Sequence, residues 1–369
     1  MSNSPPILTP SLQRWMIRVL TGNSAGKEFY LPYGRLILGS DSATQIQILS
    51  PGILPKQCEF NLDSNDATIS PIGKGTMVND RELLGQLAIF GGDIIQIGGI
   101  QLQVIDNNSS FKKLNFTISP WMAKLPKWLQ LPIALGVLSS LLLSIMLLSG
   151  NLRLVPITSI VCASFVPVGT LCYVFEKYGS TAVSIKSILI TVGLGATLGV
   201  VVTFILGIFA PDSNSWAAAP FFEEPAKLIA TIWCWYKIGY RSPLCGLILG
   251  FAAGTGFAIT ETAGYFVEGL TNGDFSSSLL ILFVRSLLSP FGHGIWTACV
   301  ASAWFQIGWQ FKGHWQPVFL RAILIAMGLH FLWNLPFFAF PISAFFSIMI
   351  FNKLLQSNGV WSAKWSFKP

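Results

Sequence analysis

Residues 131–150 read LPIALGVLSSLLLSIMLLSG, a run without a single charged side chain. A helix needs about twenty apolar residues to cross the hydrocarbon core of a bilayer, so this stretch predicts a transmembrane helix. Further apolar stretches follow it, bounded by charged or turn residues, and together they predict a polytopic α-helical membrane domain of about eight transmembrane helices. The expected spans are 131–150, 154–175, 185–210, 216–238, 244–267, 279–310, 318–339 and 341–355. The sixth span is too long for one straight helix, and we expect Pro290 to break it.

The composition of the whole chain agrees with a membrane protein. Of 369 residues, 52% are hydrophobic and 11% are charged, whereas about a quarter are charged in soluble domains. This composition excludes an ordinary soluble domain and intrinsic disorder, and the six Cys follow no disulfide framework. The net charge of +7 does not indicate nucleic-acid binding, because the charge is uneven: residues 1–130 hold 11 basic and 9 acidic side chains, and the longer remainder holds 12 and 7. We therefore expect a soluble N-terminal domain before the membrane domain.

Short apolar runs of strand length follow one another between Trp15 and Ile105. Runs such as LILG at 36–39, IIQI at 94–97 and LQV at 102–104 are separated by Gly, Pro, Asn or Asp. Many short strands at regular spacing predict an all-β sandwich. The expected division is a sandwich over 14–106, a basic linker against anionic lipid over 107–130, a membrane domain over 131–355 and a cytoplasmic tail over 356–369.

One part of the sandwich carries a recognisable motif. Residues 75–79 read GTMVN, with Gly75, Thr76 and Asn79, and a Gly-Gly-Asp turn precedes the run at 94–97. In these residues the domain resembles the forkhead-associated (FHA) fold. The resemblance implies a β-sandwich that serves in protein interaction.

The phosphate-binding positions of this fold are altered. FHA domains usually hold phosphothreonine with an Arg, a Ser and an Asn, because a phosphate dianion needs charged and hydroxyl donors. Those positions here hold Ser40, Leu54 and Lys74, and Gln57 replaces the usual His. Because these positions are altered, we expect a cytoplasmic protein partner that binds independently of phosphate. Phosphopeptide binding stays open as the alternative, with Lys74 as the only replacement cation in the motif.

Charges between the spans predict the orientation. With the N-terminus inside, the cytoplasmic segments carry most of the Lys and Arg, as the positive-inside rule requires. The opposite loops carry Arg153 and the acidic residues Asp212, Glu268 and Asp274. Residues 1–10 are polar and Pro-rich, so we expect no signal peptide there. The expected protein is multi-pass in the cell (inner) membrane, with both termini cytoplasmic.

Ionisable side chains inside the expected spans point to a functional site. An ionised group at mid-membrane costs about 2.5–3.5 kcal/mol on insertion scales, so such groups are usually functional. At about 1.5 Å per residue, Glu223 and Glu224 lie roughly 11 Å, Glu261 roughly 9 Å and His330 roughly 14 Å from the outer ends of their spans. A helix that begins near Pro290 places His293 at a similar depth. The full set is Glu223, Glu224, Lys227, Glu261, Arg285, His293, Arg321 and His330.

Spacing in the fourth span supports a built site. Glu223 and Lys227 are four residues apart and can pair on a helix. Glu224 precedes Pro225, which disfavours helical geometry for Glu224. We therefore expect a helix break here that helps both carboxylates to reach a common cavity.

Two further patterns concern packing and orientation. Gly246, Gly250 and Gly254 form a stripe of small residues that lets helices approach closely. His330 and Asn334 share one helix face, so we expect Asn334 to orient the imidazole or to bind a substrate carbonyl.

Four segments, taken in order, carry a family resemblance. FEEPAK at 222–227, GFAITE at 256–261, SPFGH at 289–293 and HFLWN at 330–334 resemble the EExxK, FxxxE and two His motifs of the PrsW family of intramembrane proteases. That family is distantly similar to the CAAX prenyl endopeptidases, which share a glutamate-centred membrane site. The resemblance implies proteolysis of a membrane-anchored protein near the outer leaflet, for example an anti-sigma factor in site-1-type regulated proteolysis.

The resemblance also implies which residues are catalytic. The matching positions are Glu223, Glu224, Glu261, His293 and His330. Two positions depart from the family pattern, since Thr262 stands where Asn is common and Cys245 where Asp is common. These departures concern substrate positioning more than chemistry.

The chemistry that these residues allow is hydrolysis by an activated water. A desolvated carboxylate can act as general base, and an imidazole can donate to the departing amine or to the oxyanion. The expected roles are Glu223 or Glu224 as base, His293 as oxyanion donor or acid, Glu261 and His330 as supports, and Lys227 and Asn334 as assisting groups. A metal could instead activate the water through His and Glu ligands. The family is often labelled metalloprotease but no HExxH occurs, so a zinc cofactor stays open.

Two other classes of function compete with a protease. Buried carboxylates and broken helices also mark transporters and channels. No internal repeat is visible in the spans, which weighs against a transporter. A non-catalytic membrane scaffold that recruits partners through the FHA-like domain is the second alternative, and the presence of all five acidic and His positions weighs against it.

Overall fold

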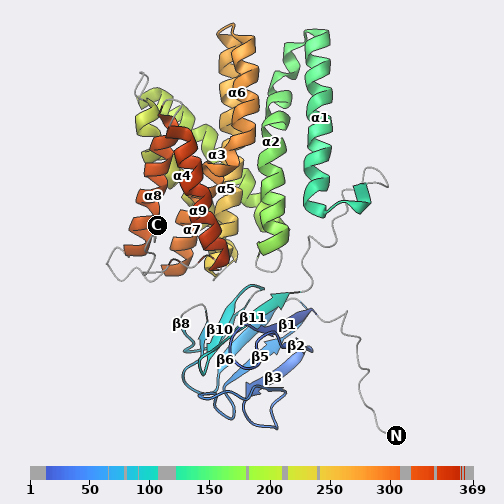
Figure 1. The fold of residues 1–369 in the computed structure, drawn as a ribbon, viewed down its shortest axis with the longest axis vertical. Coiled ribbons are helices and arrows are strands. Elements are labelled where there is room, and N and C mark those ends of the chain that lie inside the picture. Colours follow the sequence, from blue (N-terminus) through green and yellow to red (C-terminus); the bar gives the residue numbers. More distant parts are fainter. Residues whose placement is uncertain are drawn as a thin grey trace. The chain divides into compact units, whose positions relative to one another are not determined.

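The computed structural model of the chain describes residues 14–64, 66–78, 81–89, 91–106, 122–179, 183–209, 215–238, 242–307, 317–335, 339–357, 359 and 361. These residues form two compact units, a β-sandwich and a helical unit (Figure 1). Asn79 of the expected FHA motif, linker residues 107–121 and most of the expected tail lie outside the described residues. The predicted fold class, an N-terminal all-β sandwich followed by a helical membrane region, is confirmed.

The sandwich consists of two sheets of short strands. One sheet has the order β2-β1-β11-β10-β7-β8 and the other the order β4-β3-β5-β6-β9. β3 and β4 pair in parallel, and the other described ladders are antiparallel. The strands are β1 Trp15–Val19, β2 Glu28–Leu31, β3 Gly34–Gly39, β4 Ile46–Gln47, β5 Cys58–Leu62, β6 Ala67–Pro71, β7 Met77–Val78, β8 Arg81–Glu82, β9 Leu87–Ala88, β10 Ile94–Ile97 and β11 Ile100–Asp106.

The alternation of side chains along the strands builds the core of the sandwich. In β5, Cys58, Phe60 and Leu62 are buried, whereas Asn61 between them is exposed. Successive side chains of a strand point to opposite faces, so one face of each sheet is apolar and packs against the other. The prediction that apolar runs between turn residues form strands is therefore confirmed.

The helical unit contains nine α-helices within the described residues. They are α1 Lys127–Ser149, α2 Val155–Val174, α3 Ile185–Phe209, α4 Ser215–Ile238, α5 Pro243–Thr271, α6 Phe275–Leu288, α7 His293–Ile307, α8 Pro317–Asn334 and α9 Ala339–Gln356. Six described segments are long and apolar enough to cross a membrane: Trp128–Ser149, Leu152–Tyr178, Ile185–Val202, Pro243–Thr271, Phe275–Ile307 and Pro317–Asn334. α4 and α9 are not among them, and α4 carries three charged residues near its middle, so the expected count of eight is only approximate.

The long sixth span is interrupted as expected. α6 ends at Leu288, the short 3-10 turn η6 covers Ser289–Phe291 with Pro290 at its centre, and α7 begins at His293. Proline has no backbone N–H and clashes with the preceding turn, so it favours a break or kink at this point of a helix. The predicted break at Pro290 is confirmed, and it places His293 at a helix start.

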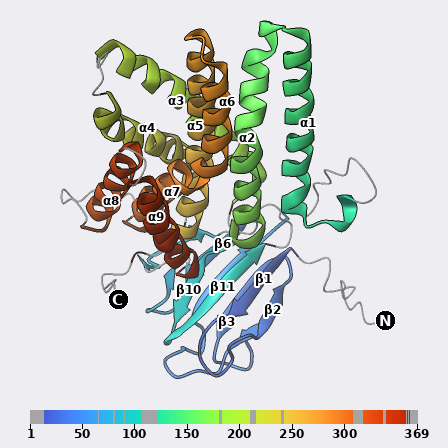
Figure 2. The same cartoon turned by 45° about the horizontal axis from the view of Figure 1, so that its top comes forward.

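α5 is the centre of the helical unit. It is buried along most of its length and packs against α2, α3, α4, α6 and α7 (Figure 2). A Cβ added at Gly250 would lie 2.5 Å from the carbonyl oxygen of Thr297, and one at Gly246 would lie 2.6 Å from that of Ala301. A Cβ at Gly254 would collide with the carbonyl oxygen of His293. The glycines therefore let α5 touch the backbone of α7, including the residue at its start.

Candidate active site

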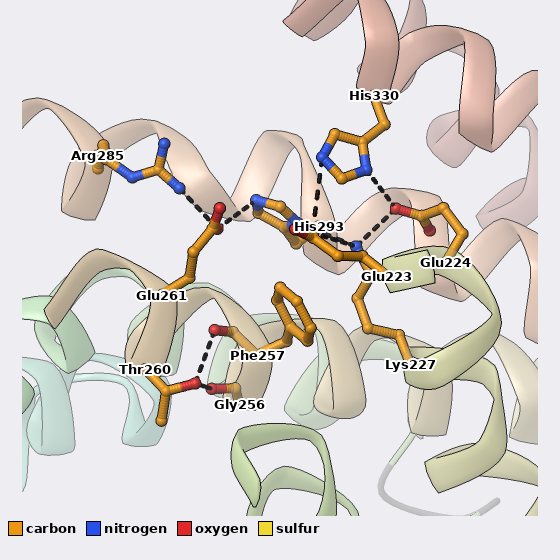
Figure 3. A network of polar contacts seen from close by, with 10 residues as sticks. All are labelled: Glu223, Glu224, Lys227, Gly256, Phe257, Thr260, Glu261, Arg285, His293 and His330. Atoms are coloured by element: carbon orange, nitrogen blue, oxygen red, sulfur yellow. Dashed lines mark hydrogen bonds and ion pairs between the residues drawn. The ribbon is translucent and has the colours of Figure 1, made fainter. Parts of the chain in front are cut away.

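Charged side chains from five helices meet in one cluster inside the helical unit (Figure 3). The cluster consists of Glu223, Glu224 and Lys227 on α4, Glu261 on α5, Arg285 on α6, His293 on α7 and His330 on α8. Lys227 has no exposed surface, and Glu224, His293 and His330 are each 1% exposed. Charges so completely buried must compensate one another.

Lys227 is the cation at the middle of the α4 acids. Its Nζ lies 2.6 Å from Glu224 Oε1 and 3.8 Å from Glu223 Oε2. The expected helix break at Pro225 is wrong, because α4 runs through that residue. In helical projection, residue 227 lies about 40° to one side of residue 223 and about 60° to the other side of residue 224, so both carboxylates reach it from an unbroken helix.

The two imidazoles bridge α4 to the other helices. His330 Nδ1 is 2.8 Å from Glu224 Oε1, and its Nε2 is 3.6 Å from Glu223 Oε2. His293 Nδ1 is 3.0 Å from Lys227 Nζ, and its Nε2 is 2.9 Å from Glu261 Oε2. The rings lie edge to face with centroids 5.2 Å apart. Carboxylates thus contact both nitrogens of His330. The role of Asn334, to orient the imidazole or to bind a substrate carbonyl, stays a prediction.

These partners assign different tautomers to the two rings. An ammonium group only donates, so His293 Nδ1 must accept from Lys227, and the proton of a neutral ring is on Nε2. A carboxylate only accepts, so His330 Nδ1 donates to Glu224, and a neutral ring then keeps its lone pair on Nε2, whose 3.6 Å contact with Glu223 Oε2 is too long for a hydrogen bond. His293 therefore presents a donor at Nε2, whereas His330 presents an acceptor at Nε2.

Arg285 is a member of the cluster that the motifs did not reveal. Its Nη2 lies 2.6 Å from Glu261 Oε2, the same oxygen that contacts His293. The guanidinium carbon also lies 4.3 Å from the ring centroid of Tyr265 on α5. The sequence placed Arg285 within a predicted span but gave it no partner. A charge inside a membrane needs a counter-ion, and this need was the signal that could have paired Arg285 with Glu261.

Several buried polar atoms of the cluster have no hydrogen-bond partner among the described residues. They include Glu223 Oε2, Glu224 Oε2 and His293 Nε2. The 2.9 Å contact of His293 Nε2 with Glu261 Oε2 therefore lies away from hydrogen-bond geometry. Buried polar atoms normally have partners, so these atoms can still bind a water, a substrate group or a metal.

The donor atoms also fit a metal. Glu223, His293 and His330 each offer one ligand atom, all within 4.8 Å of one another. Tetrahedral zinc places neighbouring N and O ligands about 3.4 Å apart, close to the 3.6 Å between His330 Nε2 and Glu223 Oε2. The contact of His330 Nδ1 with Glu224 also matches the carboxylate–histidine arrangement common behind zinc ligands. His293 could serve as a third metal ligand only if one of its ring nitrogens lost its contact, Nδ1 with Lys227 or Nε2 with Glu261.

In the sandwich, Gln57 occupies the place where the FHA motif usually has a His. It is buried, its Nε2 donates to the carbonyl oxygen of Lys74 and to Thr76 Oγ1, and its Oε1 accepts from the backbone N–H of Leu54. The amide thus ties together the two loops that carry the altered phosphate positions. Leu54 is 41% exposed and offers an apolar group where a hydroxyl donor is usual.

Comparison with known proteins agrees with both units. Residues 179–355 match the family model of the PrsW family intramembrane metalloproteases, and residues 36–98 match that of the FHA domain. A comparison with curated proteins found no match.

Among solved structures, the similar chains include three from different organisms. The FHA domain of the CT664 protein from Chlamydia trachomatis is 24% identical over 25% of this chain and 97% of that chain, with a TM-score of 0.24. The FHA domain of an Arabidopsis thaliana hypothetical protein is 22% identical over 28% and 92%, with a TM-score of 0.24. The cytoplasmic domain of the sorting platform protein PscD from P. aeruginosa is 21% identical over 26% and 81%, with a TM-score of 0.24.

The buried cluster and both family matches lead to one description. Residues 36–98 match the FHA domain in the N-terminal part of the chain, and residues 179–355 match the PrsW family of intramembrane metalloproteases.

Proposed function

We propose that this protein is an endopeptidase that cleaves membrane-anchored protein substrates at the cluster formed by α4, α5, α7 and α8. The observation that supports this function best is the convergence of three acids and two imidazoles on one buried volume, with carboxylate oxygens free to bind further groups. An anti-sigma factor is the kind of substrate that the family resemblance suggests. The proposed catalytic residues are Glu223, Glu224, Glu261, His293 and His330.

Glu223 is the proposed general base. Its Oε2 has no hydrogen-bond partner among the described residues, and its nearest cationic contact, with Lys227, is long at 3.8 Å. Glu224 is committed elsewhere, because its Oε1 takes both Lys227 at 2.6 Å and His330 at 2.8 Å. A base must be within reach of a water and free to accept its proton. Glu223 meets this condition better, and Glu224 serves to hold Lys227 and His330.

His293 is the proposed donor to the oxyanion or to the departing amine. Its Nε2 carries the ring proton in the assigned tautomer and has no hydrogen-bond partner among the described residues. Donors already aimed at the place where charge develops stabilise the transition state without reorganisation. In one turnover, Glu223 takes a proton from water as the oxygen attacks the carbonyl carbon, and that proton then passes to the departing nitrogen as the C–N bond breaks.

A divalent metal such as zinc fits the same residues, with Glu223 and His330 as ligands and His293 as the third member of the group. When bound, it would supply a water of lowered pKa and polarise the substrate carbonyl. Glu224 would then orient His330 through Nδ1.

Cleavage by the purified full chain tests this function. The assay follows a panel of single-pass membrane proteins in detergent or liposomes, with the wild type, Glu223→Gln and the matched control Glu268→Gln, an exposed acid near the end of α5. We expect Glu223→Gln to abolish cleavage and Glu268→Gln to retain it. Cleavage and metal content, both measured before and after chelator treatment, separate a metal-dependent mechanism from a glutamic one. Equal cleavage by wild type and Glu223→Gln contradicts the proposed base.

The proposed topology places both termini in the cytoplasm of a cell with the protein in its inner membrane. The proposed division of the chain is a sandwich over 14–106, a linker over 107–130, a protease domain over 131–355 and a tail over 356–369. Cysteine-accessibility labelling of intact cells at Ser24 and at the Asp274 turn tests it. An impermeant reagent reaches only residues on the outer side of the membrane, so the proposed orientation predicts labelling at Asp274→Cys and none at Ser24→Cys. Labelling of Ser24→Cys without labelling of Asp274→Cys contradicts this orientation.

The FHA domain is proposed to bind a cytoplasmic protein without a phosphate requirement. Leu54 supports this proposal because it stands where a hydroxyl donor to phosphate is usual, and Gln57 uses its amide to hold the loops at Leu54 and Lys74. Capture of partners from a lysate on the immobilised domain, with and without phosphatase treatment of the lysate before capture, tests it. Loss of the captured partner after phosphatase treatment would show that phosphate is required.

A further inference from the structure

Arg285 lies on α6, outside the four motifs of the protease domain. We propose that it is a positioning residue, which holds Glu261 and thereby fixes the ring orientation and the tautomer of His293. The effect on cleavage rests on the proposed function, whereas the effect on the imidazole can be measured without a substrate.

The first step of the argument is the geometry at one oxygen. Glu261 Oε2 lies 2.6 Å from Arg285 Nη2 and 2.9 Å from His293 Nε2. A carboxylate oxygen that contacts both groups is placed by the stronger and permanently charged partner, the guanidinium. The position of this oxygen in turn decides where negative charge faces the ring of His293.

The second step is that His293 is held from both sides. Lys227 donates to Nδ1 over 3.0 Å, and the negative oxygen of Glu261 faces Nε2. The first contact requires a lone pair on Nδ1, and the second stabilises a proton on Nε2. Phe257 also stacks on the ring, with centroids 5.6 Å apart. Without Arg285, the carboxylate of Glu261 loses the contact that holds it in place, and only Lys227 still holds the ring of His293 through a charged group.

The third step explains why an arginine suits this position. Its guanidinium carbon lies 4.3 Å from the Tyr265 ring centroid, so the plane of the group is supported by α5. α6 follows α5 after a short turn, and Asp274 caps α6 by accepting from the backbone N–H of Ser277 at 3.0 Å. Arg285 is 21% exposed and Glu261 12%, whereas Lys227 has no exposed surface. Arg285 therefore closes the outer edge of the charge network.

Ring nitrogen resonances test the proposal directly. The chain has only three histidines, His293, His314 and His330, so protein labelled with ¹⁵N-histidine gives few signals, and His→Gln variants assign them. We expect His293 protonated at Nε2 and His330 protonated at Nδ1 in the wild type. Arg285→Gln should shift or broaden the His293 signals and leave those of His330 in place.

Two further variants guard against a merely structural effect. Arg285→Lys retains the charge but loses the planar fork, and we expect it to restore the His293 signals partly. Arg321→Gln removes an exposed arginine of α8 and should change neither ring. Unchanged His293 signals in Arg285→Gln overturn the proposal. If Arg285→Gln does not fold, Arg285→Lys decides, since wild-type His293 signals there show that the fork is not needed.

Cleavage provides the second readout. We expect Arg285→Gln to lower kcat by about 10–100-fold, as is typical for residues that orient a catalytic group, with KM little changed. Arg285→Gln combined with Glu261→Gln should be no worse than Glu261→Gln alone, because both act through one oxygen. Additive losses contradict this coupling. Absence of cleavage by the wild type on every substrate would refute the proposed function but leave the resonance test of Arg285 intact.

Discussion

Lys227→Met removes the single ammonium group at the centre of the buried acids. At an effective dielectric constant of 20, the attraction is about 6 kcal/mol with Glu224 at 2.6 Å and about 4 kcal/mol with Glu223 at 3.8 Å. Desolvation of the charges offsets most of this attraction, so the measurable cost of breaking a buried pair is about 3–5 kcal/mol. We expect Lys227→Met to lower the free energy of unfolding by that amount, because two carboxylates remain buried without their cation.

The assay is SDS-induced unfolding of the full chain in mixed micelles, followed by circular dichroism. Lys227→Met is compared with Glu224→Gln and with the double variant. Replacing both members of a buried pair by neutral groups is often nearly neutral. The double variant should therefore be more stable than Lys227→Met alone, with a coupling energy of about 2–3 kcal/mol.

The control is Lys186→Met, which removes an exposed lysine of α3 and should change stability by less than about 0.5 kcal/mol. The reasoning is refuted if Lys227→Met costs no more than this control. It is also refuted if the costs of Lys227→Met and Glu224→Gln simply add, because independent effects would mean that the two charges do not compensate each other.

Three other changes test other parts of the chain. Gly250→Val forces α5 away from Thr297 and should cost about 1–3 kcal/mol in the same SDS titration; Gly264→Val, where a Cβ meets open space, is the matched control, and equal costs would contradict close packing. Trp361→Ala removes a buried indole whose Nε1 donates to Ser302 Oγ at 2.9 Å, and should lower the free energy of unfolding by about 3–5 kcal/mol. A decrease below about 1 kcal/mol would show that burial of Trp361 contributes little to stability. Burial raises the pKa of the Cys58 thiol to about 12, so at pH 8 the thiolate is scarce and iodoacetamide should alkylate Cys58 only after unfolding, as read by mass spectrometry; rapid alkylation of the native protein would show that the sandwich core opens.

Several features of this protein follow from local sequence alone. The strand runs, the apolar spans and the break at Pro290 each depend on a short stretch of chain, because side-chain alternation, span length and a missing backbone N–H act locally. Pro225 shows the limit of such reasoning. The preference of Glu224 for non-helical geometry is small compared with the packing of α4, and the helix continues through the proline.

The sequence by itself predicted that acids and imidazoles lie at a common depth in a membrane domain, because a helix converts residue number into depth. Only the tertiary structure decided which atoms face one another. Three features depend on how the helices rotate and pack: the pairing of Arg285 with Glu261, the position of Lys227 between Glu224 and His293, and a Glu223 oxygen without a hydrogen-bond partner among the described residues. Rotation of a helix about its axis leaves the depth of a residue unchanged but changes every partner of its side chain. The pairing of charges and the positions of the protons in the site therefore depend on how the helices pack.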